Sequence, residues 1–157
     1  MAFSVPRSAS YAMRMLVQLA LAGTDEHLSL SVVSAATGIS RKFLEQLATP
    51  LRQAGIIKSR SGKDGGYRLA RSPSSITVKQ VIEALYGPFA PVKCVPNPEV
   101  CFRANQCECR WVYLKMTDAV SAVLGEVTID QLVERRKKAS PIQQTIDALK
   151  PGTGKYC

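Results

Sequence analysis

The stretch "ISRKFLEQLATPLRQAGIIKSRSGKDGGYRLA", residues 39–70, decides the fold. Its second residue is Ser40, whose hydroxyl can accept an orphan backbone N–H and so begin a helix. Apolar residues then recur at steps of one, three and four, which predicts a helix with one buried face that ends at Gly55. Pro50 lies inside this helix and should kink it or shorten its regular part. The predicted buried stripe consists of Phe43, Leu44, Leu47 and Leu51.

The second half of this stretch predicts a β-hairpin. Two short runs, residues 56–60 and 67–70, flank a turn that contains Asp-Gly-Gly. Upstream, helices are expected over 8–22 and over 31–37, with Val32, Val33 and Ala36 facing inward. Gly38 supplies a tight turn between the second helix and the third. Two helices joined in this way and followed by a basic hairpin describe a winged helix-turn-helix.

Further elements follow the hairpin. A helix is expected over 77–86, and four prolines exclude a regular helix from 87–106. A long helix then runs over about 107–126, and Thr128 can begin another. The fold class is therefore mainly α (α+β). The predicted division is a winged domain over 1–87, a cysteine-bearing loop over 88–110, helices outside the winged domain over 107–138 and a flexible tail over 139–157.

Charge points to a nucleic-acid partner. The chain of 157 residues carries a net charge of +9, which favours an anionic partner. Residues 40–71 hold eight basic and two acidic residues, so six of the nine excess charges lie there. Concentration in the hairpin and the preceding helix is the footprint expected of a DNA-binding surface.

Two groups of side chains are candidates for contact with double-stranded DNA. Gln, Glu and Lys on a recognition helix can pair with base edges, whereas basic groups on the wing neutralise phosphate. The helix candidates are Ser40, Arg41, Lys42, Glu45 and Gln46, and the wing candidates are Lys58, Arg60, Lys63 and Arg68. Plain solvent exposure is the alternative for each residue, and a protein-binding adaptor is the alternative for the whole module.

No apolar run approaches the roughly 20 residues of a membrane span, and no export signal is visible. The expected compartment is the cytoplasm, with no membrane partner. Structural disulfides are rare in that reducing environment, and the odd number of cysteines, five, agrees with it.

Four of the five cysteines lie within "KCVPNPEVCFRANQCECRW", residues 93–111. Thiolates in such a set can hold zinc or an iron–sulfur cluster, or act as a metal-free redox switch. The gaps of six, five and one residues differ from the paired spacing of structural zinc sites. An enzyme or a cluster carrier is the less favoured class, because one histidine leaves little acid–base apparatus.

The quoted stretches resemble a known family. "ISRKFLEQLATPLRQAGIIKS", "GKDGGYRLA", "SASYAMRMLVQLA" and "SSITVKQVIEAL", followed by the cysteine loop, are similar to the bacterial regulator family that contains IscR, NsrR and CymR. The resemblance covers roughly residues 8–135. It implies a homodimeric winged-helix transcriptional regulator, with the long helix after the cysteine loop at the dimer interface.

The resemblance also implies site residues. DNA readout would fall to Ser40, Lys42, Phe43, Glu45 and Gln46. Cys94, Cys101 and Cys107 match the three cysteines that ligate the iron–sulfur cluster in the sensing branch, and CymR-like members lack this triad. The implied cofactor is a two-iron or four-iron cluster whose state sets DNA affinity.

The sequence departs from the family pattern around the cluster. One more residue than usual separates the first two cysteines, and in the wing Ser61 stands where Arg often precedes Gly62. The fourth-ligand position of the IscR branch corresponds to Arg110 and that of the NsrR branch to about Ser10. His27, the single histidine, lies far along the chain in a loop between helices. Cys109 is the candidate substitute, and Cys157 is expected to be incidental.

Overall fold

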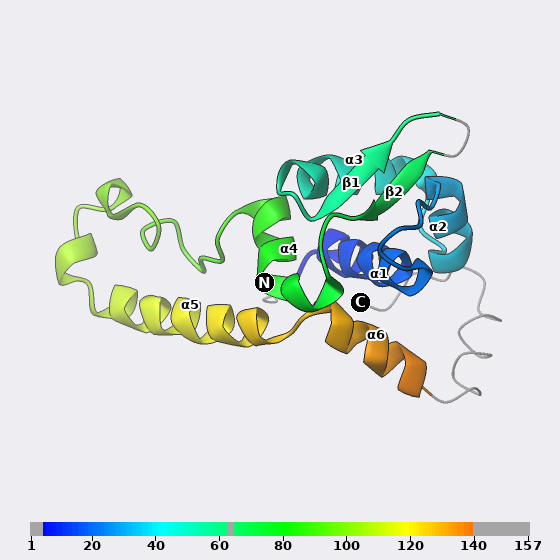
Figure 1. Ribbon diagram of the computed structural model, residues 1–157. Coiled ribbons are helices and arrows are strands. Elements are labelled where there is room, and N and C mark those ends of the chain that lie inside the picture. The colour runs from blue at the N-terminus through cyan, green and yellow to red at the C-terminus, as the bar shows by residue number, and fades with distance from the viewer. Residues whose placement is uncertain (1–4, 63–64, 140–157) are drawn as a thin grey trace.

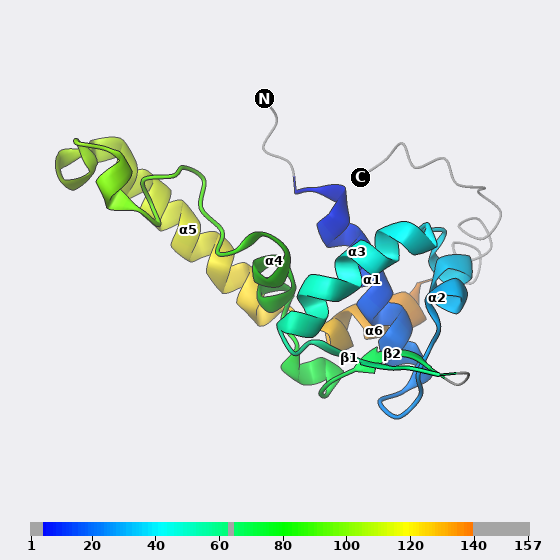
Figure 2. The ribbon, with the colours of Figure 1, turned by 90° about the horizontal axis from the view of Figure 1, so that it is seen from above.

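The computed structural model describes residues 5–62 and 65–139. A compact head holds the first helices and a two-stranded hairpin, and a long arm projects from it (Figures 1 and 2). In chain order the elements are α1 (Arg7–Ala22), α2 (Leu30–Thr37), α3 (Arg41–Gln53), β1 (Ile57–Arg60), β2 (Gly66–Leu69), η1 (Pro73–Ser75), α4 (Val78–Tyr86), η2 (Pro98–Val100), η3 (Ala104–Gln106), α5 (Glu108–Glu126) and α6 (Ile129–Lys138).

The turn between α2 and α3 follows from three consecutive residues. Gly38 has the left-handed conformation (φ 70°, ψ 11°) that ends α2. Ile39 is buried and anchors the turn in the core. The Ser40 hydroxyl accepts the backbone N–H of Phe43 at 3.3 Å and begins α3. The predicted winged helix-turn-helix and the mainly α fold class are confirmed.

The wing is tied to the rest of the head by a short bridge. β1 and β2 pair antiparallel, with Ile57 opposite Leu69. On the other side of β2, Leu28 and Tyr67 exchange two backbone hydrogen bonds of 2.9 and 2.8 Å. Gly66 allows this approach, because a Cβ there would lie 2.5 Å from the Leu28 carbonyl oxygen. The glycine pair before Tyr67 therefore serves packing as well as the turn.

Replacing Gly66 with alanine is expected to lower the free energy of unfolding by about 1–3 kcal/mol, because the new Cβ must push Leu28 away and break the bridge. Thermal or denaturant unfolding of the variant measures this. Gly125→Ala is the matched control: a Cβ there meets only the Lys79 side chain, at 3.9 Å. Since Gly125 lies in α5, alanine should leave stability unchanged or raise it by up to about 1 kcal/mol. Equal losses in both variants would contradict the assignment.

The core lies between α1, α3, the wing and α6. Met15, Leu16, Leu44 and Leu51 have no exposed surface. The first residue of α6, Ile129, is also fully buried, and Val133 is 6% exposed. α3 lies on one side of α1 and α6 on the other (Figures 1 and 2). The structure thus packs one side of α6 onto the core of the head, while the dimerisation role predicted for residues 107–138 stays a prediction.

The arm leaves the head after α4 and returns to it through α5. Residues 87–106 run outward through short turns and two 3-10 helices, which confirms the predicted absence of a regular helix. At the base, Val78 N–H donates to the Val127 carbonyl at 2.8 Å and Ile129 N–H donates to the Ile76 carbonyl at 2.9 Å. Thr128 caps α6 as predicted. The end of the arm is therefore joined to the segment that begins α4, and α5 packs against α4.

Two expectations about packing are wrong. Val32 is 50% exposed and Ala36 is exposed, because α2 turns only Leu30 and Val33 into the core. Pro50 lies inside α3, which continues to Gln53 because its buried leucines hold the last turn, while the kink predicted at Pro50 stays a prediction.

Across the described residues, no helix has both the length and the apolar character needed to cross a bilayer.

Candidate nucleic-acid interface and cysteine loop

The outer face of α3 carries the predicted recognition residues. Ser40, Arg41, Lys42, Glu45 and Gln46 are all exposed, on the side opposite the buried leucines. The Nε of Arg41 lies 3.0 Å from Oε1 of Glu45, one turn along the helix. These two side chains are 67% and 50% exposed, so the pair adds little stability. It brings the Arg41 guanidinium and the Glu45 carboxylate together on the exposed face of α3.

Phe43 has a supporting role in this structure. Its ring is partly buried and meets Tyr11 of α1 edge-on, with centroids 5.5 Å apart and planes at 85°. The Arg14 guanidinium lies over the other ring of this pair, 5.8 Å from the Tyr11 centroid. Phe43 therefore braces the start of α3 against α1, and its exposed edge lies beside the recognition residues.

The wing residues fall into two sets. Lys58 and Arg60 are exposed on β1, as phosphate contacts require, and Lys63 lies outside the described residues. Arg68 is partly buried, and its guanidinium donates to the carbonyls of Thr24 at 2.9 Å and Leu69 at 3.3 Å. Arg68 thus links β2 to the segment after α1, which a basic residue in a hairpin does not reveal from sequence.

His27 lies at the base of the wing. It lines a shallow hollow with Asp25, Glu26 and Arg60, among others. Desolvation, followed by the positive charges of Arg60 and Arg68, lowers the pKa of His27 below its ordinary value. The histidine therefore belongs to the electropositive wing and takes no part in the cysteine loop.

The cysteine loop forms the outer part of the arm. Cys94, Cys101 and Cys107 are partly buried free thiols, whereas Cys109 is exposed in the first turn of α5. Hydrogen bonds within residues 92–106 are short-range turns, such as Ala104 N–H to the Cys101 carbonyl at 3.0 Å. The three cysteines of the predicted triad are therefore less exposed than Cys109.

The described conformation does not gather the cysteines into a metal site. Within residues 5–62 and 65–139, no three His, Cys, Asp or Glu side chains lie close enough together to hold a metal ion. The donor chemistry fits, because three thiols on one loop suit an iron–sulfur cluster. A cluster would therefore require the loop to close around it. Arg110, at the position of the IscR-branch ligand, donates from Nε to the Cys94 carbonyl at 2.9 Å.

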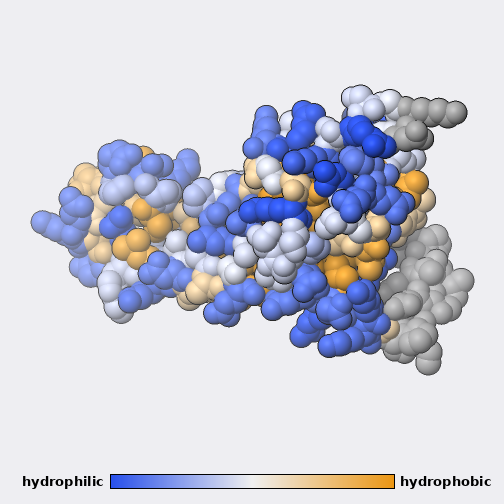
Figure 3. Space-filling view, in the orientation of Figure 1, coloured by the Kyte–Doolittle hydropathy of each residue, from blue (hydrophilic) through white to orange (hydrophobic). Residues whose placement is uncertain are grey.

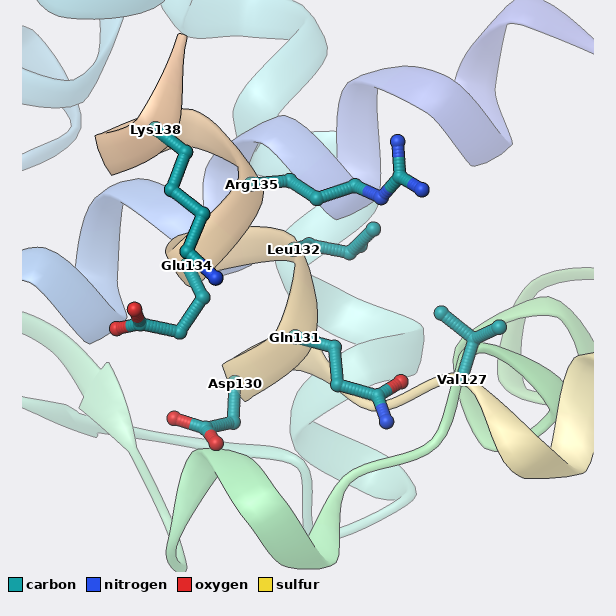
Figure 4. Close-up of a pocket in the computed structure, with 7 residues that line it drawn as sticks. All are labelled: Val127, Asp130, Gln131, Leu132, Glu134, Arg135 and Lys138. Atoms are coloured by element: carbon teal, nitrogen blue, oxygen red, sulfur yellow. The ribbon is translucent and has the colours of Figure 1, made fainter.

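A second hollow lies along α6, on the side of α1 away from α3. Asp130, Glu134, Arg135 and Lys138 contribute both signs of charge to it. In Figure 4, Leu132 and Gln131 point toward the side of Val127, while the two acids point away from it. This mixed and open surface has no cluster of catalytic or ligating groups, and it holds none of the residues predicted to contact DNA.

Sequence reasoning missed Arg14 and the contacts that Arg68 and Arg110 make. Arg14 contacts Tyr11 within one helix, whereas Arg68 and Arg110 reach Thr24 and Cys94 in segments distant along the chain. Periodicity carries no signal for contacts between distant segments.

The chain is similar to known regulators over most of its length. The model of the family described as "Rrf2: Iron-dependent Transcriptional regulator" matches residues 5–135. HTH-type transcriptional regulator CymR of Bacillus subtilis (strain 168) is 33% identical over 122 residues, covering 78% of this chain and 83% of that protein. HTH-type transcriptional regulator IscR of Yersinia pseudotuberculosis is 31% identical over 126 residues, covering 80% and 76%. The solved structure of T. potens IscR superposes with a TM-score of 0.69 at 26% identity, covering 92% and 98%.

Proposed function

This chain belongs to the Rrf2 family and is a DNA-binding transcriptional regulator, and from that premise we propose that it is a homodimeric sensor. An iron–sulfur cluster on the cysteine loop would set its affinity for an operator. The observation that carries the proposal is the arrangement of its parts. A DNA-binding head, a loop with three partly buried thiols and a long helix without a buried residue follow one another, and both ends of the arm meet at the head.

The exposed face of α3 supports DNA readout. Lys42, Glu45 and Gln46 are directed away from the core and offer the donor and acceptor groups that major-groove edges require. Lys58 and Arg60 on the wing would neutralise phosphate. A regulator that binds DNA in this way must share a compartment with the chromosome, which supports a cytoplasmic location.

The exposed seam of α5 supports a homodimer. None of the 19 residues of this helix is buried. Val112 is 47% exposed and Val123 is 61% exposed. Together with Met116 and Ala119 they repeat at steps of four, three and four, the spacing of a coiled-coil seam. Figure 3 shows hydrophobic surface on the arm among hydrophilic atoms. A second copy of α5 would cover this seam.

The resemblance and the loop chemistry support the cluster. The family is described as iron-dependent, and Cys94, Cys101 and Cys107 occupy the triad positions of its sensing branch. A cluster when bound would cross-link the loop, and the thiolates of these residues would hold it. Because the arm and the head meet at the Val78–Val127 bond, a change in loop shape can alter the separation of the two heads of a dimer.

A cluster-free thiol regulator is the second candidate. It is favoured by two observations: CymR is similar over 78% of the chain, and the described cysteines are not gathered for metal binding. In that case oxidation of the loop thiols would replace the cluster as the signal.

The test compares one duplex that contains an operator with one of scrambled sequence, bound by anaerobically purified protein and by the same protein after iron chelation. We expect iron and sulfide in the purified protein, a steep fall of affinity with salt from phosphate contacts, and operator affinity that differs between the two states. A colourless protein that binds the operator equally well before and after chelation would contradict cluster sensing. Affinity that then changes on thiol oxidation would favour the second candidate.

A further inference from the structure

The cysteine loop is linked to α5 by a side chain that is not a ligand. Arg110 lies in the first turn of α5, three residues after Cys107. Its Nε donates to the carbonyl oxygen of Cys94 at 2.9 Å, across sixteen residues of chain. The backbone hydrogen bonds within residues 92–106 each span only three or four residues. The hydrogen bond from Arg110 therefore joins two parts of the loop that the local turns do not connect.

The tie restrains the first and third cysteines relative to each other. Cys107 is the N-cap of α5, so the helix sets its distance from Arg110. The hydrogen bond then places the backbone of Cys94 beside that same turn. Cys101 lies between the two 3-10 turns and is not held by this contact. Two of the three triad positions are thus restrained in the absence of any metal.

Arginine suits this role chemically. A guanidinium cannot ligate a metal, but its planar set of donors makes strong hydrogen bonds to a carbonyl while the charge stays near solvent. Arg110 is partly buried, so its stem packs along the arm and its direction is restricted. A neutral side chain of similar length would form a weaker bond.

We propose that Arg110 is a positioning residue that clasps Cys94 to the first turn of α5 and so restrains Cys94 and Cys107 relative to each other before the loop closes around a cluster. This inference rests on the proposed function for its purpose, but the clasp itself is a property of the protein without metal. A preorganised loop has less conformational entropy to lose when it closes around a ligand. Arg110, which stands at the position that corresponds to the fourth ligand of the IscR branch, makes a structural hydrogen bond here.

The test measures the accessibility of each cysteine in the full-length, metal-stripped protein under anaerobic conditions. The readout is the rate of alkylation of each cysteine, followed by mass spectrometry. We expect Arg110→Ala to raise the rate at Cys94 about three- to tenfold, because loss of the hydrogen bond increases local opening. The rate at the already exposed Cys109 should stay unchanged.

Two further variants complete the test. Arg103→Ala removes an exposed positive charge from the same loop, so it controls for electrostatic effects on thiol reactivity and should leave Cys94 near the wild-type rate. Arg110→Lys keeps the charge and one donor, and should restore part of the protection. An unchanged Cys94 rate in Arg110→Ala, an equal rise in Arg103→Ala, or a uniform rise at all cysteines would each overturn the clasp.

Iron loading separates this inference from the proposed function. Reconstitution with ferrous iron and sulfide should give less iron per protomer in Arg110→Ala than in wild type at equal iron concentration. If wild type takes up no iron, cluster sensing fails, while the alkylation rates still decide whether the clasp exists. If both proteins load equally despite faster alkylation of Cys94, the clasp exists without the preorganising role, and the proposal is overturned.

Discussion

Cys107→Ala is expected to lose essentially all bound iron and sulfide and to bind operator DNA with the affinity of iron-stripped wild type, whatever the iron supply. Cys107 is both the N-cap of α5 and the third cysteine of the predicted triad. Its removal would leave Cys94 and Cys101 as the two remaining members of the triad, with only the exposed Cys109 beside them, and two triad thiols are too few to hold a cluster. The measurements are visible absorbance, iron and sulfide content, and duplex affinity by anisotropy.

Cys109→Ala is the matched control, because it removes a thiol only two residues away. Cys109 is exposed, whereas Cys107 is partly buried with the other triad members, so this variant should retain its iron. Loss of iron in both variants would instead assign Cys109 as the fourth ligand. Iron retained in Cys107→Ala would remove this residue from the proposed ligand set.

Val123→Glu is expected to convert the dimer into monomers. The side chain is 61% exposed on the seam of α5, and a two-fold dimer would bury two carboxylates without partners. Such burial costs on the order of 3 kcal/mol, so the dimer dissociation constant should rise on the order of 100-fold. Operator affinity should fall by about 10²–10⁴, because two linked heads bind far more tightly than one.

Sedimentation or light scattering reports the oligomeric state, and anisotropy reports the affinity. Val100→Glu makes the same substitution at a residue of the arm that is 58% exposed but outside the seam. It should stay dimeric and bind the operator normally. A Val123→Glu protein that remains dimeric would show that α5 is not the interface.

Short-range sequence signals correctly predicted the helices and the turn of the head. The leucines of α3, the glycine of the turn and the cap at Ser40 each act within one element, so their spacing alone indicates the winged helix-turn-helix. Thr128 was predicted as an N-cap for the same reason, and its capping box with Gln131 agrees. The recognition residues on α3 follow from the same periodicity, since a buried stripe defines the exposed face.

Contacts between distant segments could not be predicted in this way. The Leu28–Tyr67 bridge joins residues 39 positions apart, and nothing in either segment identifies its partner. Ile129 and Val133 mark one apolar side of α6, but not whether α1 or another protomer covers it. The thiols of the loop are predicted by composition and resemblance, whereas the tie from Arg110 depends on the folded arm.

The base of the arm has a consequence for modularity. Ile76 and Val78 on one side are hydrogen-bonded to Ile129 and Val127 on the other. α4 belongs to the head, because Val81 is fully buried in the core, and α5 packs against α4 where it returns. The arm after Tyr86 is therefore topologically an insertion whose two attachment points on the head are already neighbours. Such an insertion can be exchanged for another of different length or chemistry without changing the path of the chain through the core.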